Sequence, residues 1–123
     1  MAPAELLQRT RAFALAVTRF VRTLPKTDEA QEAASQLRRA ANATRSNYRS
    51  ARKGRSRAEF IAKLGVAREE ADECVDWLEY LRDAGIAEDA ALLAESNELA
   101  AILTASMKTA SRNWHRTKEL PRS

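Results

Sequence analysis

Basic side chains gather in one acid-free stretch of the sequence. Residues 36–60 read QLRRAANATRSNYRSARKGRSRAEF, and the chain has no acidic residue between Glu32 and Glu59. The stretch carries eight basic residues, which are Arg38, Arg39, Arg45, Arg49, Arg52, Lys53, Arg55 and Arg57. Arginine and lysine neutralise phosphates, so this stretch predicts recognition of a polyanion. A purely structural role would need acids from another helix or another subunit, because residues 33–58 hold no acid and no i,i+4 ion pair can form inside that window.

Groups that could catalyse a reaction or bind a metal are sparse. The carboxylate-rich segment EEADECVD at 69–76 lacks the inward-facing histidines of a di-iron bundle, because the only histidine is His115. The single cysteine, Cys74, excludes an internal disulfide and a Cys-based zinc cluster, and its place in an apolar pattern favours a buried thiol. The sequence has no Ser-His-Asp set and no glycine-rich phosphate loop. We therefore expect no enzymatic activity, no cofactor and no metal site.

The composition predicts an all-α protein. The 123 residues are 31% charged and 45% apolar, with only three glycines and three prolines, which is typical of helical domains. The N-terminal residues lack the apolar core of a signal peptide, and no window reaches the roughly 18 apolar residues of a membrane span. We expect a cytoplasmic protein with no membrane partner.

Hydrophobic spacing and end signals predict four helices, at about 3–24, 28–52, 57–84 and 87–114. Pro25 stops the first helix, and Thr27 can cap the second. Ser56 and Glu59 form a capping box for the third helix, which Gly85 ends. The basic tail 115–123 has no periodicity and is expected to fray.

The apolar seams of the two middle helices are rich in small residues. The predicted seam of 28–52 consists of Ala30, Ala34, Leu37, Ala41, Thr44 and Tyr48. The predicted seam of 57–84 consists of Phe60, Leu64, Ala67, Ala71, Cys74, Leu78 and Leu81. Four long helices with short connections predict one domain over 1–123, an antiparallel four-helix bundle with up-down-up-down topology.

That topology brings basic residues to one end of the bundle. Residues 1–13, 45–66 and 106–123 share this end, which we call the basic pole; they hold fourteen basic and three acidic residues, a net charge of +11. The remaining residues hold seven basic and fourteen acidic, a net charge of −7. The candidate nucleic-acid contacts are Arg49, Arg52, Lys53, Arg55, Arg57, Lys63, Lys108, Arg112 and Arg116. We favour the turn around Gly54, where the backbone can approach a ligand closely.

Charge also predicts contacts between helices or subunits. An acidic stripe of Glu69, Asp72, Asp76, Glu79 and Asp83 recurs on one face of the third helix, opposite a basic stripe that includes Arg38 and Arg45 on the second. The two stripes would pair within one chain or between subunits. Apolar residues away from the seams point to subunit contacts as well. The candidate interface residues are Leu15, Arg38, Arg45, Ile61, Asp72, Asp76 and Trp77.

Several motifs in this order resemble the four-helix-bundle proteins encoded within intervening sequences of bacterial 23S rRNA genes. The motifs are Q-L-R-R-A-A at 36–41, a basic turn at 52–55, S-x-x-E-F at 56–60, A-x-x-E-A-D-E at 67–73 and W-L-E at 77–79. The chain departs from the family at 47–51, which reads NYRSA where N-I-A-E-G is commoner. A role of that family glutamate therefore does not carry over.

The resemblance implies a homopentamer of antiparallel four-helix bundles. The relatives include accessory proteins of diversity-generating retroelements, similar basic pentamers that bind a reverse transcriptase and nucleic acid. Together with the basic pole, the resemblance predicts a non-catalytic, oligomeric accessory protein that binds RNA or DNA. The alternative is a protein-interaction scaffold that docks a partner enzyme such as a reverse transcriptase.

Overall fold

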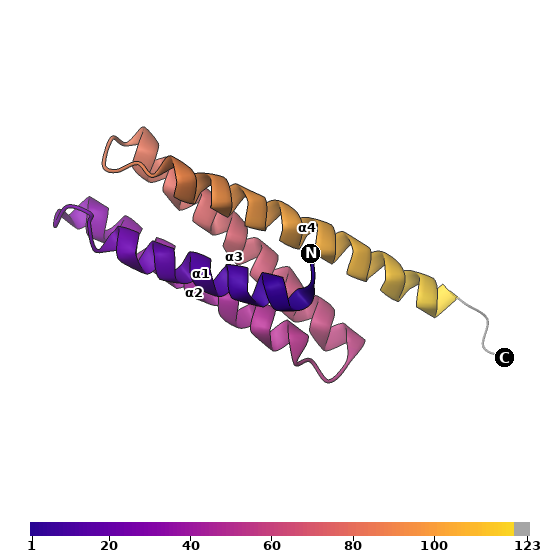
Figure 1. Ribbon diagram of the computed structural model, residues 1–123. Coiled ribbons are helices and arrows are strands. Elements are labelled where there is room, and N and C mark those ends of the chain that lie inside the picture. The colour runs from indigo at the N-terminus through magenta and orange to yellow at the C-terminus, as the bar shows by residue number, and fades with distance from the viewer. Residues whose placement is uncertain (120–123) are drawn as a thin grey trace.

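Four helices build the protein. The computed structural model describes residues 1–119, with the side chains of residues 1–114. The helices are α1 (Pro3–Val21), α2 (Asp28–Arg52), α3 (Arg57–Asp83) and α4 (Ala90–Glu119). Each helix runs antiparallel to the one before it, and α4 lies back beside α1 (Figure 1). The predicted all-α, up-down-up-down bundle is confirmed.

The predicted end signals have the expected geometry. The Thr27 hydroxyl accepts a hydrogen bond from the backbone N–H of Ala30 at 3.3 Å. Likewise, the Ser56 hydroxyl accepts from the N–H of Glu59 at 3.1 Å. After α3, Gly85 adopts a positive φ of 71°, and the N–H of the next residue reaches back 3.0 Å to the Leu81 carbonyl. This is the Schellman closure that favours glycine.

Three helix boundaries differ from the prediction. The final turn of α1 tightens to i→i−3 hydrogen bonds, so that helix ends at Val21 and not at residue 24. Helix α4 begins at Ala90 because the Asp89 carboxylate, 2.9 Å from the N–H of Leu92, caps it there. Helix α4 also continues through Glu119, since the sequence has no glycine or proline between Ala90 and Pro121. The tail predicted to fray is thus helical over 115–119, and 120–123 lie outside the described residues.

The predicted seams form the core. All six predicted seam residues of α2 are buried, as are the α3 seam residues from Leu64 to Leu81. Phe20 of α1, and Phe60 at the start of the α3 seam, are only partly buried. Among neighbouring helices, α2 and α3 have the most extensive interface, because their alanines let the backbones approach closely, whereas α1 and α4 have the least extensive. The sequence of core residues therefore places the tightest packing in the middle of the chain.

Cys74 lies in this tight interface with none of its surface exposed. Burial raises the pKa of its thiol to about 12, so the thiol stays protonated at neutral pH. The predicted buried thiol is confirmed. Within the described part of the chain, no group of three or more His, Cys, Asp or Glu could hold a metal ion. None of the described helices has an apolar stretch long enough to cross a membrane.

Gly54 closes the loop between α2 and α3. A Cβ atom at this position would lie 3.2 Å from the Ala51 carbonyl oxygen and 3.2 Å from the Phe60 backbone nitrogen. We expected a ligand to approach the backbone closely at Gly54. In the structure, the space beside Gly54 is instead filled by the backbone of the chain itself, where the loop packs against the first turn of α3. The missing side chain lets a short loop join the two most tightly packed helices.

Replacing Gly54 with alanine is expected to lower the free energy of unfolding by about 1 kcal/mol, because two backbone atoms held in helix ends must move. Gly65→Ala is the matched control. A Cβ at Gly65, inside α3, would contact only the flexible Met107 side chain, at 3.4 Å. Alanine should stabilise this helix by up to about 1 kcal/mol. Urea unfolding of both variants measures the difference, and equal shifts would contradict the packing assigned to Gly54.

Candidate nucleic-acid interface

A groove between α1 and α2 collects five basic side chains near the N-terminal end of α1. The groove has a volume of about 570 Å³, and Ala4 and Leu7 contribute to its apolar floor. Its basic residues are Arg11, Arg45, Arg49, Arg52 and Lys53. Among the residues that the structure describes, no acid lines this cavity. We call it the basic groove.

The helical repeat explains why these residues meet. Arg45, Arg49 and Arg52 are spaced by four and three residues, which places them on one face of α2. Lys53 follows as the C-cap residue of the same helix. Arg11 reaches the groove from α1, which packs alongside α2 in antiparallel orientation. Two helices therefore supply one continuous basic surface.

The charges of the basic groove are not neutralised by ion pairs. In the described part of the chain, no carboxylate lies within 4.0 Å of a charged nitrogen of its five basic residues. The only hydrogen bond that these side chains make there runs from Arg45 Nε to the Asn42 side-chain oxygen, at 2.9 Å. The guanidinium groups keep most of their donors free for an anionic ligand.

Pairing between α2 and α3 involves a different arginine from those predicted. Arg39 bonds Glu70 at 2.8 Å and Glu73 at 2.6 Å, and these bonds raise the pKa of its guanidinium. Arg38, which is one residue away and rotated by about 100°, lines a separate small groove with Arg22 and Lys26. Within the described residues, the two predicted stripes therefore do not pair with each other, and the ion pairs between α2 and α3 run through Arg39 instead.

Arg9 belongs to the basic pole by sequence, yet its charge is compensated. Its guanidinium makes two hydrogen bonds to Glu95 of α4, at 2.9 and 2.7 Å, and a contact of 2.8 Å with Glu98. The hydrogen bonds to Glu95, then those to Glu98, raise the pKa of Arg9. The two glutamates are three residues apart, a spacing that puts both on one face of α4. The bonds join α1 and α4 across the least extensive interface in the bundle.

The other predicted nucleic-acid contacts whose side chains are described do not line the basic groove. Arg55 lies exposed in the loop, and Lys63, Lys108 and Arg112 are exposed on α3 and α4. Arg57 turns toward a second cavity, where its guanidinium carbon lies 5.6 Å from the centre of the Phe60 ring. The side chain of Arg116 lies outside the described residues. Arg11 and Arg45 belong to the groove, although the spacing in the sequence did not assign them to it.

The predicted subunit contacts lie on several parts of the surface. Leu15 is 47% exposed, and both Asp72 and Asp76 are exposed, whereas Ile61 is partly buried. Trp77 is also partly buried and packs edge-to-face on Tyr80, with ring centres 5.6 Å apart. Asp72 lies 3.7 Å from Arg68 of its own helix. Subunit contact stays a prediction for these residues.

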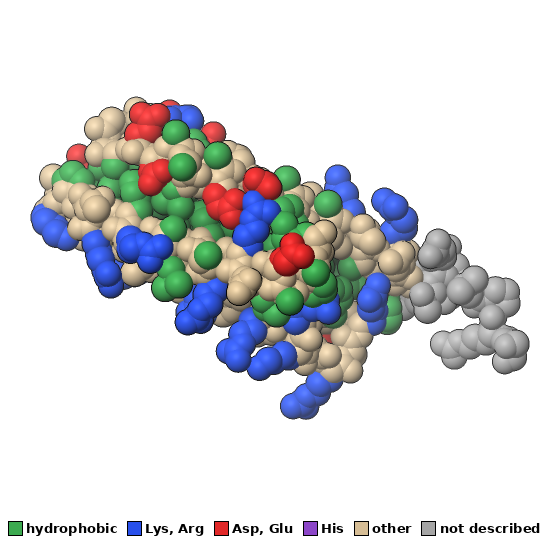
Figure 2. Space-filling model, viewed as in Figure 1, with side chains coloured by type: hydrophobic (Ala, Val, Ile, Leu, Met, Phe, Trp, Pro, Cys, Tyr) green, Lys and Arg blue, Asp and Glu red, His purple; other side chains and the backbone are tan. Residues whose placement is uncertain are grey.

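Charge is divided across the bundle as well as along it. Residues 1–53, which form α1 and α2, hold eleven basic and four acidic residues, whereas 54–123 hold ten and thirteen. Figure 2 shows lysine and arginine side chains along the side of α1 and α2, with most visible acidic side chains toward the other side. The basic groove thus lies on the more basic of the two sides of the molecule.

The sequence of the chain matches a family described as 23S rRNA-intervening sequence protein over residues 3–105. The chain belongs to this family. The crystal structure of a protein of unknown function from the S23 ribosomal protein family of Bacteroides thetaiotaomicron is similar to it, with 27% identity and a TM-score of 0.77. The similarity covers 88% of this chain and 99% of the other. No curated protein matches the chain.

The family assignment confirms the resemblance seen in the motifs. All five basic residues of the groove fall inside the part matched to the 23S rRNA-intervening sequence proteins, as does the loop that Gly54 closes. The matched part stops at residue 105, so the last turns of α4 lie beyond it. The groove is therefore built within the family's own fold.

Proposed function

We propose that this protein is a non-catalytic accessory protein that binds RNA or DNA by holding the sugar-phosphate backbone in the basic groove. The observation that carries the proposal is the convergence on one cavity of five basic side chains, none of which forms an ion pair with another described residue. An unpaired arginine or lysine binds phosphate with release of condensed counterions, which favours association at moderate salt. Backbone contacts of this kind give affinity for many sequences.

The dimensions of the groove suit an extended strand. From Arg45 to Arg52 the α2 axis rises about 10 Å, enough to reach more than one backbone phosphate. Arg11 contributes a donor from the opposite wall of the groove. The apolar floor at Ala4 and Leu7 offers a surface for sugars between the phosphates. A strand lying along α2 would therefore contact charges on both helices.

A salt series tests the proposal. The affinity for a single-stranded RNA and for the DNA strand of the same sequence should fall linearly with the logarithm of salt concentration. With about four phosphates neutralised, the slope for single strands should be close to −3. Fluorescence anisotropy between about 50 and about 200 mM salt measures it. Affinity that does not change with salt, or no binding at the lowest salt, would contradict the proposal.

A scaffold that self-associates and docks a partner enzyme is the second candidate. Large apolar residues stay exposed on α1 and α3, with Leu15, Val66 and Tyr80 each 40% to 49% exposed. Where exposed apolar residues form a large contiguous patch, the patch marks a surface at which subunits or partners meet. Light scattering should then give a mass near five times 13.7 kDa, as the predicted pentamer requires. A mass of 13.7 kDa at every concentration would contradict self-association.

A further inference from the structure

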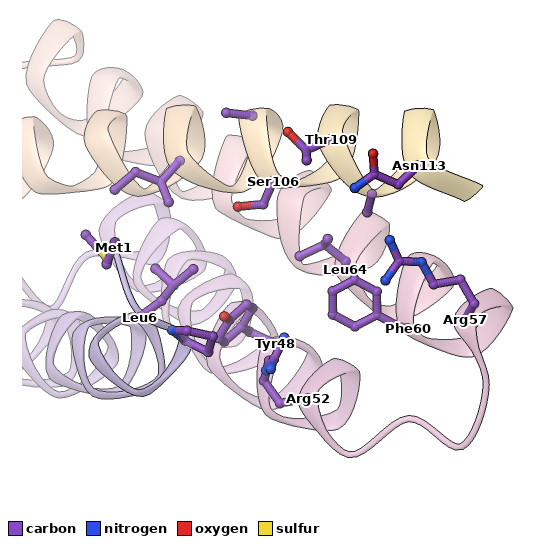
Figure 3. A pocket seen from close by; sticks show the side chains of 14 residues that line it. Met1, Leu6, Tyr48, Arg52, Arg57, Phe60, Leu64, Ser106, Thr109 and Asn113 are labelled. Atoms are coloured by element: carbon purple, nitrogen blue, oxygen red, sulfur yellow. The ribbon is translucent and has the colours of Figure 1, made fainter. Parts of the chain in front are cut away.

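A second cavity opens at the same end of the bundle as the basic groove. It has a volume of about 510 Å³ and is lined by residues from all four helices (Figure 3). The cavity exists because α1 is short: α1 has 19 residues and α4 has 30, and α4 extends past the N-terminus of α1 (Figure 1). We call it the end cavity. Its volume is within the range of small-ligand sites, about 300–1,000 Å³.

Tyr48 places a polar group at the apolar floor of the end cavity. Only 4% of the residue is exposed, and its hydroxyl points toward the cavity between Leu6 and Leu64 (Figure 3). In the described part of the chain, this hydroxyl has no hydrogen-bond partner. Burial raises the pKa of Tyr48, so the phenol stays protonated and can donate or accept. A hydroxyl that faces the cavity in this state favours a ligand with polar groups on a flat apolar body.

Two arginines flank an aromatic ring at the mouth of the cavity. The guanidinium carbons of Arg52 and Arg57 lie 5.7 and 5.6 Å from the centre of the Phe60 ring. Contact with the ring holds both planar cations at the mouth of the cavity. Guanidinium planes and aromatic rings are the surfaces on which proteins stack unpaired nucleobases. Across the cavity, α4 contributes the hydroxyls of Ser106 and Thr109 (Figure 3).

Arg52 connects the two sites, because it lines both the basic groove and the end cavity. A strand whose phosphates lie in the groove therefore passes beside the mouth of the cavity. We infer that the end cavity takes one unpaired nucleobase of that strand, stacked on the Arg52 and Arg57 planes, with its polar edge toward the Tyr48 hydroxyl. This inference rests on the proposed function. It makes single strands, and not duplexes, the preferred ligand.

The experiment compares two DNA strands of about 12 nucleotides, oligo-thymidine and the same backbone with abasic sites at every position. The natural protein should bind the abasic strand about tenfold more weakly, since stacking of one base is lost. Tyr48→Phe removes only the hydroxyl, and Arg57→Lys keeps the charge but removes the plane. Each variant should reduce this preference about threefold while the affinity for the abasic strand stays constant.

Arg55→Lys is the matched control, because Arg55 lies in the same loop region but lines neither cavity. It should leave the preference unchanged. Circular dichroism confirms that each variant is folded. Equal affinity of the natural protein for both strands, with the expected dependence on salt, would overturn the end-cavity inference and leave the groove intact. Failure of both strands to bind would overturn the proposed function itself.

Discussion

Replacing Arg45, Arg49 and Lys53 together with serine is expected to weaken binding of a single strand by on the order of 100-fold at low salt. Each side chain loses a charge-assisted contact worth roughly 1 kcal/mol. The salt slope should become shallower by about 2, because three fewer phosphates are neutralised. All three residues are on the surface of α2 or at its end, so the helix content should stay the same.

A second triple variant separates the groove from net charge. Arg22, Lys26 and Arg38 line another cavity between α1 and α2, toward the other end of these helices. Changing them to serine removes the same charge but leaves the basic groove unaltered, and the salt slope should change by less than half as much. Anisotropy titrations of both variants in parallel give the comparison. Equal losses would show that binding follows overall charge, which contradicts a local site.

Replacing Leu37 with alanine is expected to cost about 2–5 kcal/mol of unfolding free energy. Leu37 is fully buried, and the rest of the α2 seam is formed largely by alanines, including Ala34 and Ala41. Alanines have no rotamer with which to fill the space that a leucine leaves, so the cavity should stay open. Urea unfolding monitored by circular dichroism measures the loss.

Leu15→Ala is the control for that substitution, because it removes the same atoms from a side chain that is 47% exposed. Its effect on the unfolding of the single chain should stay within about 0.5 kcal/mol. If both leucines cost the same, the buried face of α2 is not where the stability of the fold resides. A loss below about 1 kcal/mol at Leu37 would mean that neighbouring residues can collapse into the cavity.

Local sequence signals, namely helix caps and the spacing of apolar residues, predicted the fold well. The Ser56 cap, the Gly85 closure and the seam residues of α2 and α3 depend on spacing alone, and all are present in the structure. The start of α4 was predicted at residue 87, which is too early, because the cap at Asp89 lies inside the segment that was assigned to the helix. The end of α4 was missed because a polar helix without an apolar stripe looks irregular in sequence.

The composition of the site was predicted better than its geometry. The acid-free stretch drew attention to α2, yet the arginines on that helix separate by their rotation around its axis. On α2, Arg39 faces Glu70, whereas Arg45 and Arg49 face the basic groove. Arg57, which begins α3, faces the end cavity. Arg11 joined the groove only through the packing of α1 on α2. The spacing of residues within one helix does not determine which face of a neighbouring helix they contact. These assignments therefore required the tertiary structure.

The thin interface between α1 and α4 has a consequence for how the molecule moves. Regions with few buried contacts open at lower free energy than the rest of a domain, and α1 is the helix least tied to its neighbours on this side. The salt bridges from Arg9 to Glu95 and Glu98 connect the two helices there. Breaking these salt bridges would let α1 detach as a local unfolding unit while α2 and α3 stay paired. Amide hydrogens of α1 would then exchange faster than those of the central hairpin.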